Sequence, residues 1–153
     1  MRKPFHPNTS SLDPELLKTP VTLQTNWHVL TGSACSGKTT LVELFASRGF
    51  KVLHESAREQ FEAELASGRT LEQINIDNFQ LQHKIANLQM KYERQLNPQD
   101  EVFLDRALPD CIPHCRYWGM DTNPILKKCL HHRYRSVFLL DRFPGMVCIW
   151  SLV

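Results

Sequence analysis

Short apolar runs alternate with amphipathic stretches along most of this 153-residue chain. Four apolar runs have the length and composition of buried strands, and they lie at residues 27–30, 51–55, 101–104 and 136–140. Between them, apolar residues recur every three or four positions, as on one face of a helix. These helical stretches lie at residues 41–45, 56–67, 81–96, 109–118 and 124–130. Strands that alternate with helices predict an α/β fold with a parallel sheet covered on both faces.

Local signals divide the chain further. Ser56 to Glu59 and Thr70 to Gln73 both have the S/T-x-x-E/Q pattern of a capping box, which predicts a helix start at each. Gly68 lies where the first of these helices is expected to end. Residues 1–24 contain four prolines among serines and threonines without a sustained period. We expect a flexible N-terminal tail there, followed by one domain over residues 25–153.

The most informative motif directly follows the first strand. Residues 32–39 read Gly-Ser-Ala-Cys-Ser-Gly-Lys-Thr, a complete G-x-x-x-x-G-K-[ST] phosphate-binding loop. A strand before it and a helix after it place main-chain N–H groups and the positive end of a helix dipole around one anion. Lys38 is expected to reach the β- and γ-phosphates, and the Thr39 hydroxyl to bind Mg²⁺. The expected nucleotide contacts are Gly32, Ser33, Ala34, Cys35, Ser36, Gly37, Lys38, Thr39 and Thr40. A chance match is the alternative, and the strand and helix on either side argue against it.

Charged residues follow two further strands. Asp105 ends the third apolar run, where a carboxylate holds Mg²⁺ or accepts a proton from an attacking hydroxyl; a helix-capping aspartate is the alternative. Arg106 either neutralises phosphate charge or forms a surface ion pair, and Asp110 is expected to face solvent. Glu55 and Arg58 follow the second strand, where they contact an acceptor or remain surface charges. Because the carboxyl ends of parallel strands share one rim, we expect these groups to converge on the phosphate loop.

Composition narrows the class of partner. A formal net charge of +2 is too small to indicate nucleic-acid binding. No apolar run approaches the roughly 20 residues that span a bilayer. Five cysteines, an odd number, without an export signal favour reduced thiols and a cytoplasmic protein. Cys111, His114 and Cys115 raise the alternative of a zinc site, but their spacing matches no standard zinc pattern.

Three segments together carry a family resemblance. Residues 30–41, 54–59 and 103–110 resemble the compact AAA-type ATPase/kinase-like family of P-loop proteins, which is similar to ribosylnicotinamide-kinase domains and, more distantly, to thymidylate and deoxynucleoside kinases. The resemblance implies a three-layer P-loop fold with strand order 2-3-1-4.

The resemblance also implies roles for individual residues. Lys38, Asp105 and Arg106 would be the catalytic residues, with Thr39 and Asp105 on Mg²⁺. Glu55 and Arg58 match the E-x-x-R element with which kinase relatives contact the acceptor.

The resemblance stops after residue 140. Relatives continue with an arginine-bearing lid and a fifth strand, whereas this chain ends in the apolar run 146–153. We expect the lid and fifth strand to be missing, as after a shifted reading frame or a premature stop, which would leave a sheet edge exposed.

The implied function is that of an ATP-binding protein with Mg²⁺ as cofactor. It would act as an ATPase or transfer a phosphoryl group to a small nucleoside-like acceptor. The alternatives are a GTPase-like switch, although the chain has no N-K-x-D guanine-reading element, and a remnant that binds nucleotide without turnover. The sequence leaves the oligomeric state open.

Overall fold

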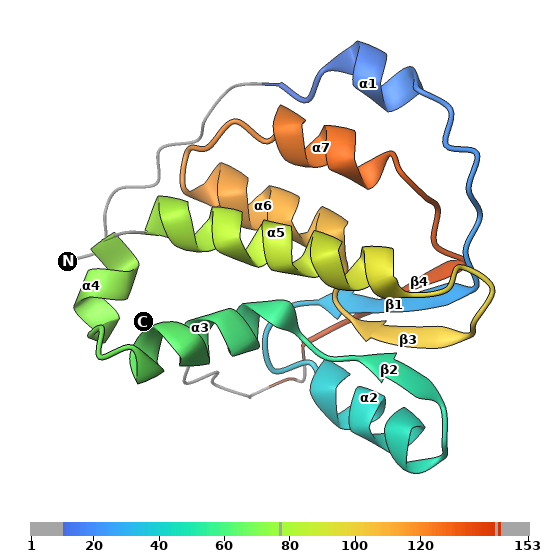
Figure 1. Cartoon of the computed structure of the whole chain (residues 1–153), viewed down its shortest axis with the longest axis horizontal. Helices are drawn as coiled ribbons and strands as arrows, with labels where there is room; N and C mark the ends of the chain where they lie inside the picture. The colour runs from blue at the N-terminus through green and yellow to red at the C-terminus, as the bar shows by residue number, and fades with distance from the viewer. Residues whose placement is uncertain (1–10, 77, 143, 145–153) are drawn as a thin grey trace.

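The computed structural model describes residues 11–76, 78–142 and 144. A parallel sheet of four strands in the order β2-β3-β1-β4 forms its centre (Figure 1). The strands are β1 (Trp27–Gly32), β2 (Lys51–Leu53), β3 (Val102–Asp105) and β4 (Ser136–Leu140). This confirms both the α/β class and the strand order expected from the sequence.

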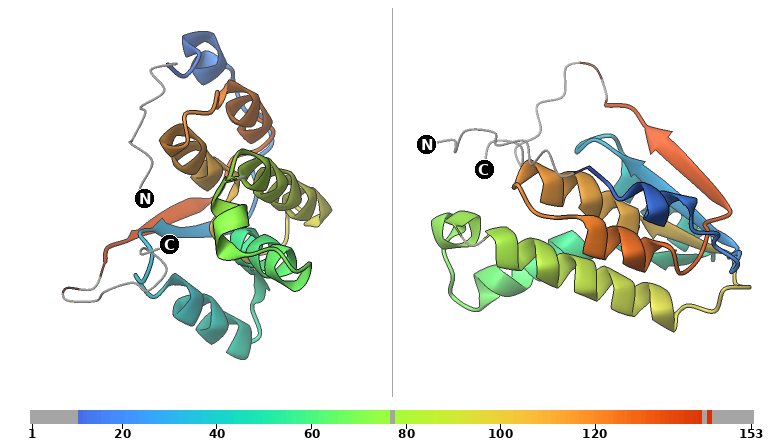
Figure 2. Two further views of the ribbon diagram at one scale, coloured as in Figure 1. Left: turned by 90° about the vertical axis from the view of Figure 1, so that its left-hand side faces the viewer. Right: turned by 90° about the horizontal axis from the view of Figure 1, so that it is seen from above.

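Helices cover the two faces of the sheet unequally. They are α1 (Pro14–Lys18), α2 (Lys38–Ser47), α3 (Ser56–Ala66), α4 (Leu71–Ile76), α5 (Asn78–Gln95), the 3₁₀ turn η1 (Leu108–Asp110), α6 (Cys111–Tyr117) and α7 (Asn123–Cys129). Figures 1 and 2 show α2 on one face and α5, α6 and α7 on the other, with α1 outside α7. α1 lies within the segment 1–24, which was expected to be a flexible tail, and its start is capped by the Asp13 side chain. The result is a three-layer arrangement.

The two faces of the sheet have different cores. Toward α5, alternate residues of β1 and β3 form a cluster: Trp27, Val29, Val102 and Leu104, with Ala107. Toward α2, the ring of Phe45 stacks on that of Phe103, with 4.0 Å between centroids. Within α2 the fully buried residue is Val42, whereas Leu44 is 44% exposed. The apolar residues of the predicted helical stretch 41–45 therefore do not all point inward, because α2 alone covers this face among the described residues and buries only a narrow stripe.

A second core lies between the helices on the α5 side. It includes Ile74, Ile85, Cys111, Cys115 and Met120. Burial raises the pKa of the Cys115 thiol to about 11, as expected for a thiol that packs as a small apolar group. Among the described residues, no group of three or more histidine, cysteine or acidic side chains is placed to hold a metal. The zinc alternative therefore has no support in this part of the chain.

Three cysteines of the described residues, Cys111, Cys115 and Cys129, are free thiols. These three agree with the expectation of reduced thiols.

Only one of the two predicted capping boxes forms. The Thr70 N–H donates to Gln73 Oε1 over 2.9 Å, and the Gln73 N–H donates to Thr70 Oγ1 over 3.2 Å, which confirms the second box. The first is wrong: Glu55 occupies the N-cap of α3, and Ser56 is already inside the helix. The Ser56 hydroxyl instead donates to Gln89 in the interior, over 2.6 Å. A long-range partner has replaced the local one.

β4 ends the sheet on one side. In the described part of the chain no strand pairs with its outer edge (Figure 2). Val137 is 59% and Leu139 75% exposed, although the run reads as a fully buried strand. The exposed edge expected from the sequence is therefore present among the described residues. The expected absence of a lid and a fifth strand concerns the end of the chain, most of which lies outside the described residues. Within the same residues, no helix has both the length and the apolar character required to cross a membrane.

Candidate functional site

The phosphate loop joins the end of β1 to the start of α2. Gly32 has φ +128°, and a Cβ at this position would collide with the main-chain carbonyl oxygen of Leu140 on β4. Gly37 has φ +84° and caps α2. Cys35, which has a Cβ, also adopts a positive φ of +59°. Gly32 is required because a Cβ would not fit there, and Gly37 because other residues rarely adopt its φ. The motif therefore forms the tight turn that its sequence predicts.

Lys38 folds its side chain into this loop. The side chain is buried, and its ammonium donates to the Ser33 carbonyl oxygen over 2.5 Å and to Ser36 Oγ over 3.1 Å. Burial lowers the pKa of Lys38, and the nearby Arg106 guanidinium lowers it further. An anion in the loop would relieve that cost, so the lysine is poised for a phosphate.

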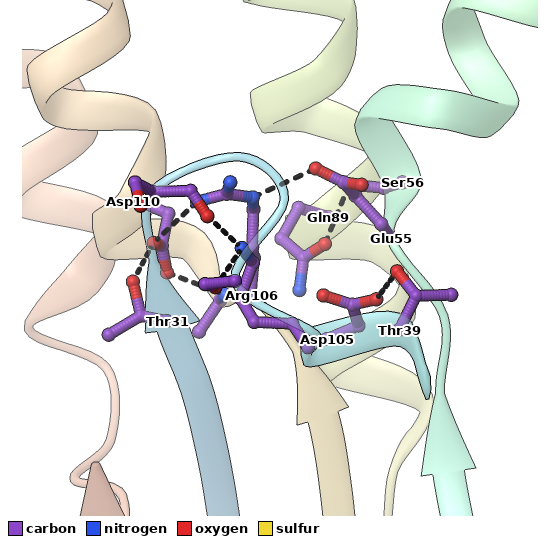
Figure 3. A network of polar contacts seen from close by, with 12 residues as sticks. Thr31, Thr39, Glu55, Ser56, Gln89, Asp105, Arg106 and Asp110 are labelled. Atoms are coloured by element: carbon purple, nitrogen blue, oxygen red, sulfur yellow. Dashed lines mark hydrogen bonds and ion pairs between the residues drawn. The ribbon is translucent and has the colours of Figure 1, made fainter. Parts of the chain in front are cut away.

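Asp105 lies at the end of β3, facing the first turn of α2. Its Oδ2 accepts a hydrogen bond from the Thr39 hydroxyl over 2.8 Å, shown in Figure 3. The side chain is 1% exposed, and its other oxygen, Oδ1, has no hydrogen-bond partner among the described residues. Burial raises the pKa of this carboxyl, against the opposing effect of the Thr39 bond.

A buried carboxylate oxygen without a partner is costly unless something else satisfies it. A carboxylate beside a hydroxyl is the oxygen donor set that Mg²⁺ prefers. Thr39 and Asp105 therefore fit the ion that the sequence assigns to them.

Arg106 begins the turn after β3 in a left-handed conformation, with φ +68°. Its main-chain N–H donates to the Leu30 carbonyl oxygen over 3.0 Å, which anchors the turn to β1. Its Nε donates to Glu55 Oε1 over 2.8 Å, and Nη1 lies 3.4 Å from Asp110 Oδ1. These side chains are largely buried, so Arg106 forms an internal ion-pair network and not the surface ion pair considered as an alternative.

The expectation that Asp110 faces solvent is wrong. Instead of facing solvent, its carboxylate accepts hydrogen bonds from the Thr31 hydroxyl and, over 2.9 Å, from the Ala107 N–H (Figure 3). It links the end of β1, the turn after β3 and the Arg106 guanidinium.

A comparison with protein families decides the family. The family model described as the AAA domain matches residues 27–148. The chain belongs to this AAA domain family. A comparison with curated proteins finds none that matches it.

Membership in the AAA domain family, a complete phosphate loop and the parallel sheet establish a P-loop nucleotide-binding protein. The structure brings together four of the residues named in advance: Lys38, Asp105, Arg106 and Glu55, which interact electrostatically with one another. Arg58 does not join them. It is exposed on α3, and the described residues give it no hydrogen bond or ion pair. Within the loop, Ser33, Ala34 and Thr40 are exposed, whereas Ser36 is buried.

Proposed function

We propose that this AAA-domain protein binds ATP with Mg²⁺ and transfers the γ-phosphoryl group to a small nucleoside-like acceptor, or to water when no acceptor is bound. The contact between Thr39 and Asp105, next to the buried Lys38, is the observation that carries this proposal. It places a hydroxyl, a carboxylate and an ammonium at the strand ends where phosphoryl transfer uses them.

On the phosphate side, this proposal gives each group a separate role. Main-chain N–H groups of residues 32–39 and the Lys38 ammonium hold the β- and γ-phosphates. Thr39 and Asp105 hold Mg²⁺, which neutralises charge on the phosphate oxygens when bound. Arg106 adds positive charge close to Lys38 and stabilises charge on the transferred group.

The acceptor side lies around Glu55. Its carboxylate would accept hydrogen bonds from ribose hydroxyls. Such bonds are stronger than those between neutral groups, because the acceptor is charged. Arg58 is exposed at the same helix start and is free to turn toward an acceptor phosphate or sugar. Because Arg106 contacts Glu55 directly, the acceptor hydroxyl and the γ-phosphate would meet at this ion pair.

Nucleotide binding is tested by titrating a fluorescent ATP analogue, mant-ATP, with and without Mg²⁺. Lys38→Ala removes the buried ammonium, so we expect about 10- to 100-fold weaker binding. Lys127→Ala, at an exposed position on α7, is the control and should bind as the wild type does. Unchanged affinity in Lys38→Ala would remove the proposal. Competition by GTP as strong as that by ATP would instead favour the switch-like alternative.

Turnover is tested with γ-labelled ATP and a panel of the four common ribonucleosides and nicotinamide riboside. Label in a nucleoside monophosphate identifies a kinase, and label in free phosphate identifies an ATPase. Asp105→Asn should abolish either reaction. Tight binding without any labelled product would support the binding-only alternative.

A further inference from the structure

Glu93, on the last turns of α5, is a buried carboxylate to which the nucleotide site assigns no role. It is 1% exposed, accepts three hydrogen bonds and faces one histidine ring nitrogen. Oε1 receives the Gln89 amide and the Leu108 N–H, each over 2.8 Å. Oε2 receives the Tyr134 hydroxyl over 2.8 Å and faces His132 Nε2 at 3.0 Å. A carboxylate so fully satisfied fixes the elements that supply its donors.

Both donors to Oε1 lead back to the nucleotide site. Leu108 starts η1, two residues after Arg106. Gln89 is 2% exposed, and its Oε1 accepts the hydroxyl of Ser56, the first residue of α3 after Glu55. Figure 3 shows this contact beside the pair formed by Glu55 and Arg106.

These contacts close a ring. One branch runs from Glu93 through Leu108 along the main chain to Arg106, and the other runs through Gln89 and Ser56 to Glu55. The branches meet again in the bond between Arg106 Nε and Glu55 Oε1. β2 and β3 are neighbours in the sheet, but the residues beyond their ends have no strand pairing to hold them together. The ring supplies that connection.

We propose that Gln89 and Glu93 are positioning residues that set the distance between Glu55 and Arg106. Apolar packing between α3 and α5 would hold the helices together but would leave their relative shift loosely defined, because it is not directional. Hydrogen bonds between buried groups are directional and are stronger in a low-dielectric interior. Gln89 uses its carbonyl toward α3 and its amide toward Glu93, so an apolar side chain of similar size does not replace it.

A double-mutant cycle tests the ring without any ligand. Glu55→Gln and Arg106→Gln, singly and together, give the coupling between the two side chains from urea unfolding. We expect the coupling to change the unfolding equilibrium constant roughly tenfold in the wild type. In a Gln89→Leu background, the coupling should change the unfolding equilibrium constant by less than half that factor, that is, by less than about fivefold. Gln82→Leu, which removes an amide two turns earlier on α5, should leave it unchanged.

The kinetic test rests on the proposed function. With a nucleoside that the wild type phosphorylates, Gln89→Leu should raise the KM for that nucleoside about tenfold. Its Kd for mant-ATP should stay within twofold, because the main-chain N–H groups and the Lys38 ammonium, which are proposed to hold the β- and γ-phosphates, lie outside the ring. A merely structural role would weaken both ligands equally, and that result would overturn the proposal.

Ser56→Ala is a second variant that can be measured if Gln89→Leu does not fold. It removes one hydroxyl from the same branch and should give a smaller shift in the same direction. Ser67→Ala, at the other end of α3, is its control, because among the described residues the Ser67 hydroxyl donates to the Glu64 carbonyl oxygen of its own helix and to no other group.

The two proposals fail separately. If the wild type phosphorylates no nucleoside, the transfer function fails and the cycle alone decides the ring. An undiminished coupling in both Gln89→Leu and Ser56→Ala overturns the ring whatever the enzyme activity.

Discussion

The two halves of the nucleotide site are built in opposite ways. The phosphate half comprises residues 32–39 and Asp105, and most of it is one continuous strand, loop and helix. Three of its residues have positive φ, so main-chain conformation defines its shape. The half that we propose to contact the acceptor, called the acceptor half below, comprises Glu55, Asp110 and Arg106, the last of which is also proposed to face the transferred group. These residues come from two different strand ends and are joined by side-chain ion pairs.

The two halves should therefore tolerate substitutions differently. A loop that binds through main-chain N–H groups requires a particular backbone conformation but accepts different side chains, whereas an ion-pair network depends on each of its charged side chains. The halves also affect one another electrostatically. Arg106 lowers the pKa of Lys38, and Glu55 raises the pKa of Asp105. A change of charge in the acceptor half is therefore expected to shift the pKa values of Lys38 and Asp105.

Gly32→Ala tests how far the phosphate half depends on its main-chain conformation, and it should have the largest effect. The new Cβ meets the main chain of β4, which has little freedom to move, and φ is strained as well. We expect a loss of about 3 kcal/mol in the free energy of unfolding, measured in urea. Gly68→Ala is the matched control, since Gly68 also has positive φ but open space around it, and should cost about 1 kcal/mol. Equal losses would show that φ alone matters and that the contact with β4 does not.

Glu55→Gln tests the dependence of the acceptor half on charge. It keeps the size of the side chain but weakens a partly buried, charge-assisted bond, so unfolding should become easier by about 1.5 kcal/mol. The matched control is Glu15→Gln, whose pair with Lys18 is exposed on both sides and should contribute almost nothing. If the two variants lose the same stability, the acceptor half is no more than a surface ion pair.

Asp105→Asn should have the smallest effect and the opposite sign. Because burial raises the folded-state pKa of Asp105, the charged form is disfavoured, and that cost is present above the raised pKa and absent below the ordinary value of 3.8. Without ligand, the variant should be more stable than the wild type by roughly 1 kcal/mol at pH 7. The advantage should disappear as the pH falls toward 4. A variant less stable at pH 7 would mean that the carboxylate stabilises the empty site.

The contrast between the halves also explains what the sequence predicts. β4 matches the predicted range, and the phosphate loop forms as expected, because apolar runs and a contiguous motif carry their own information. The Thr70 capping box succeeds for the same reason. Asp110 and Ser56 were misjudged because their partners, Thr31 and Gln89, lie far away in the sequence. Local propensity predicts that Asp110 faces solvent in a first helical turn and that Ser56 caps a helix. In the fold, tertiary contacts determine the position of both side chains instead.

The contact between Gly32 and the Leu140 carbonyl oxygen has a mechanical consequence. Gly32 is the register partner of Leu140 at the end of the pairing between β1 and β4, and the outer edge of β4 has no strand partner among the described residues. We therefore expect any force or association that displaces β4 to displace the first residue of the phosphate loop as well, because the two backbones leave no room between them.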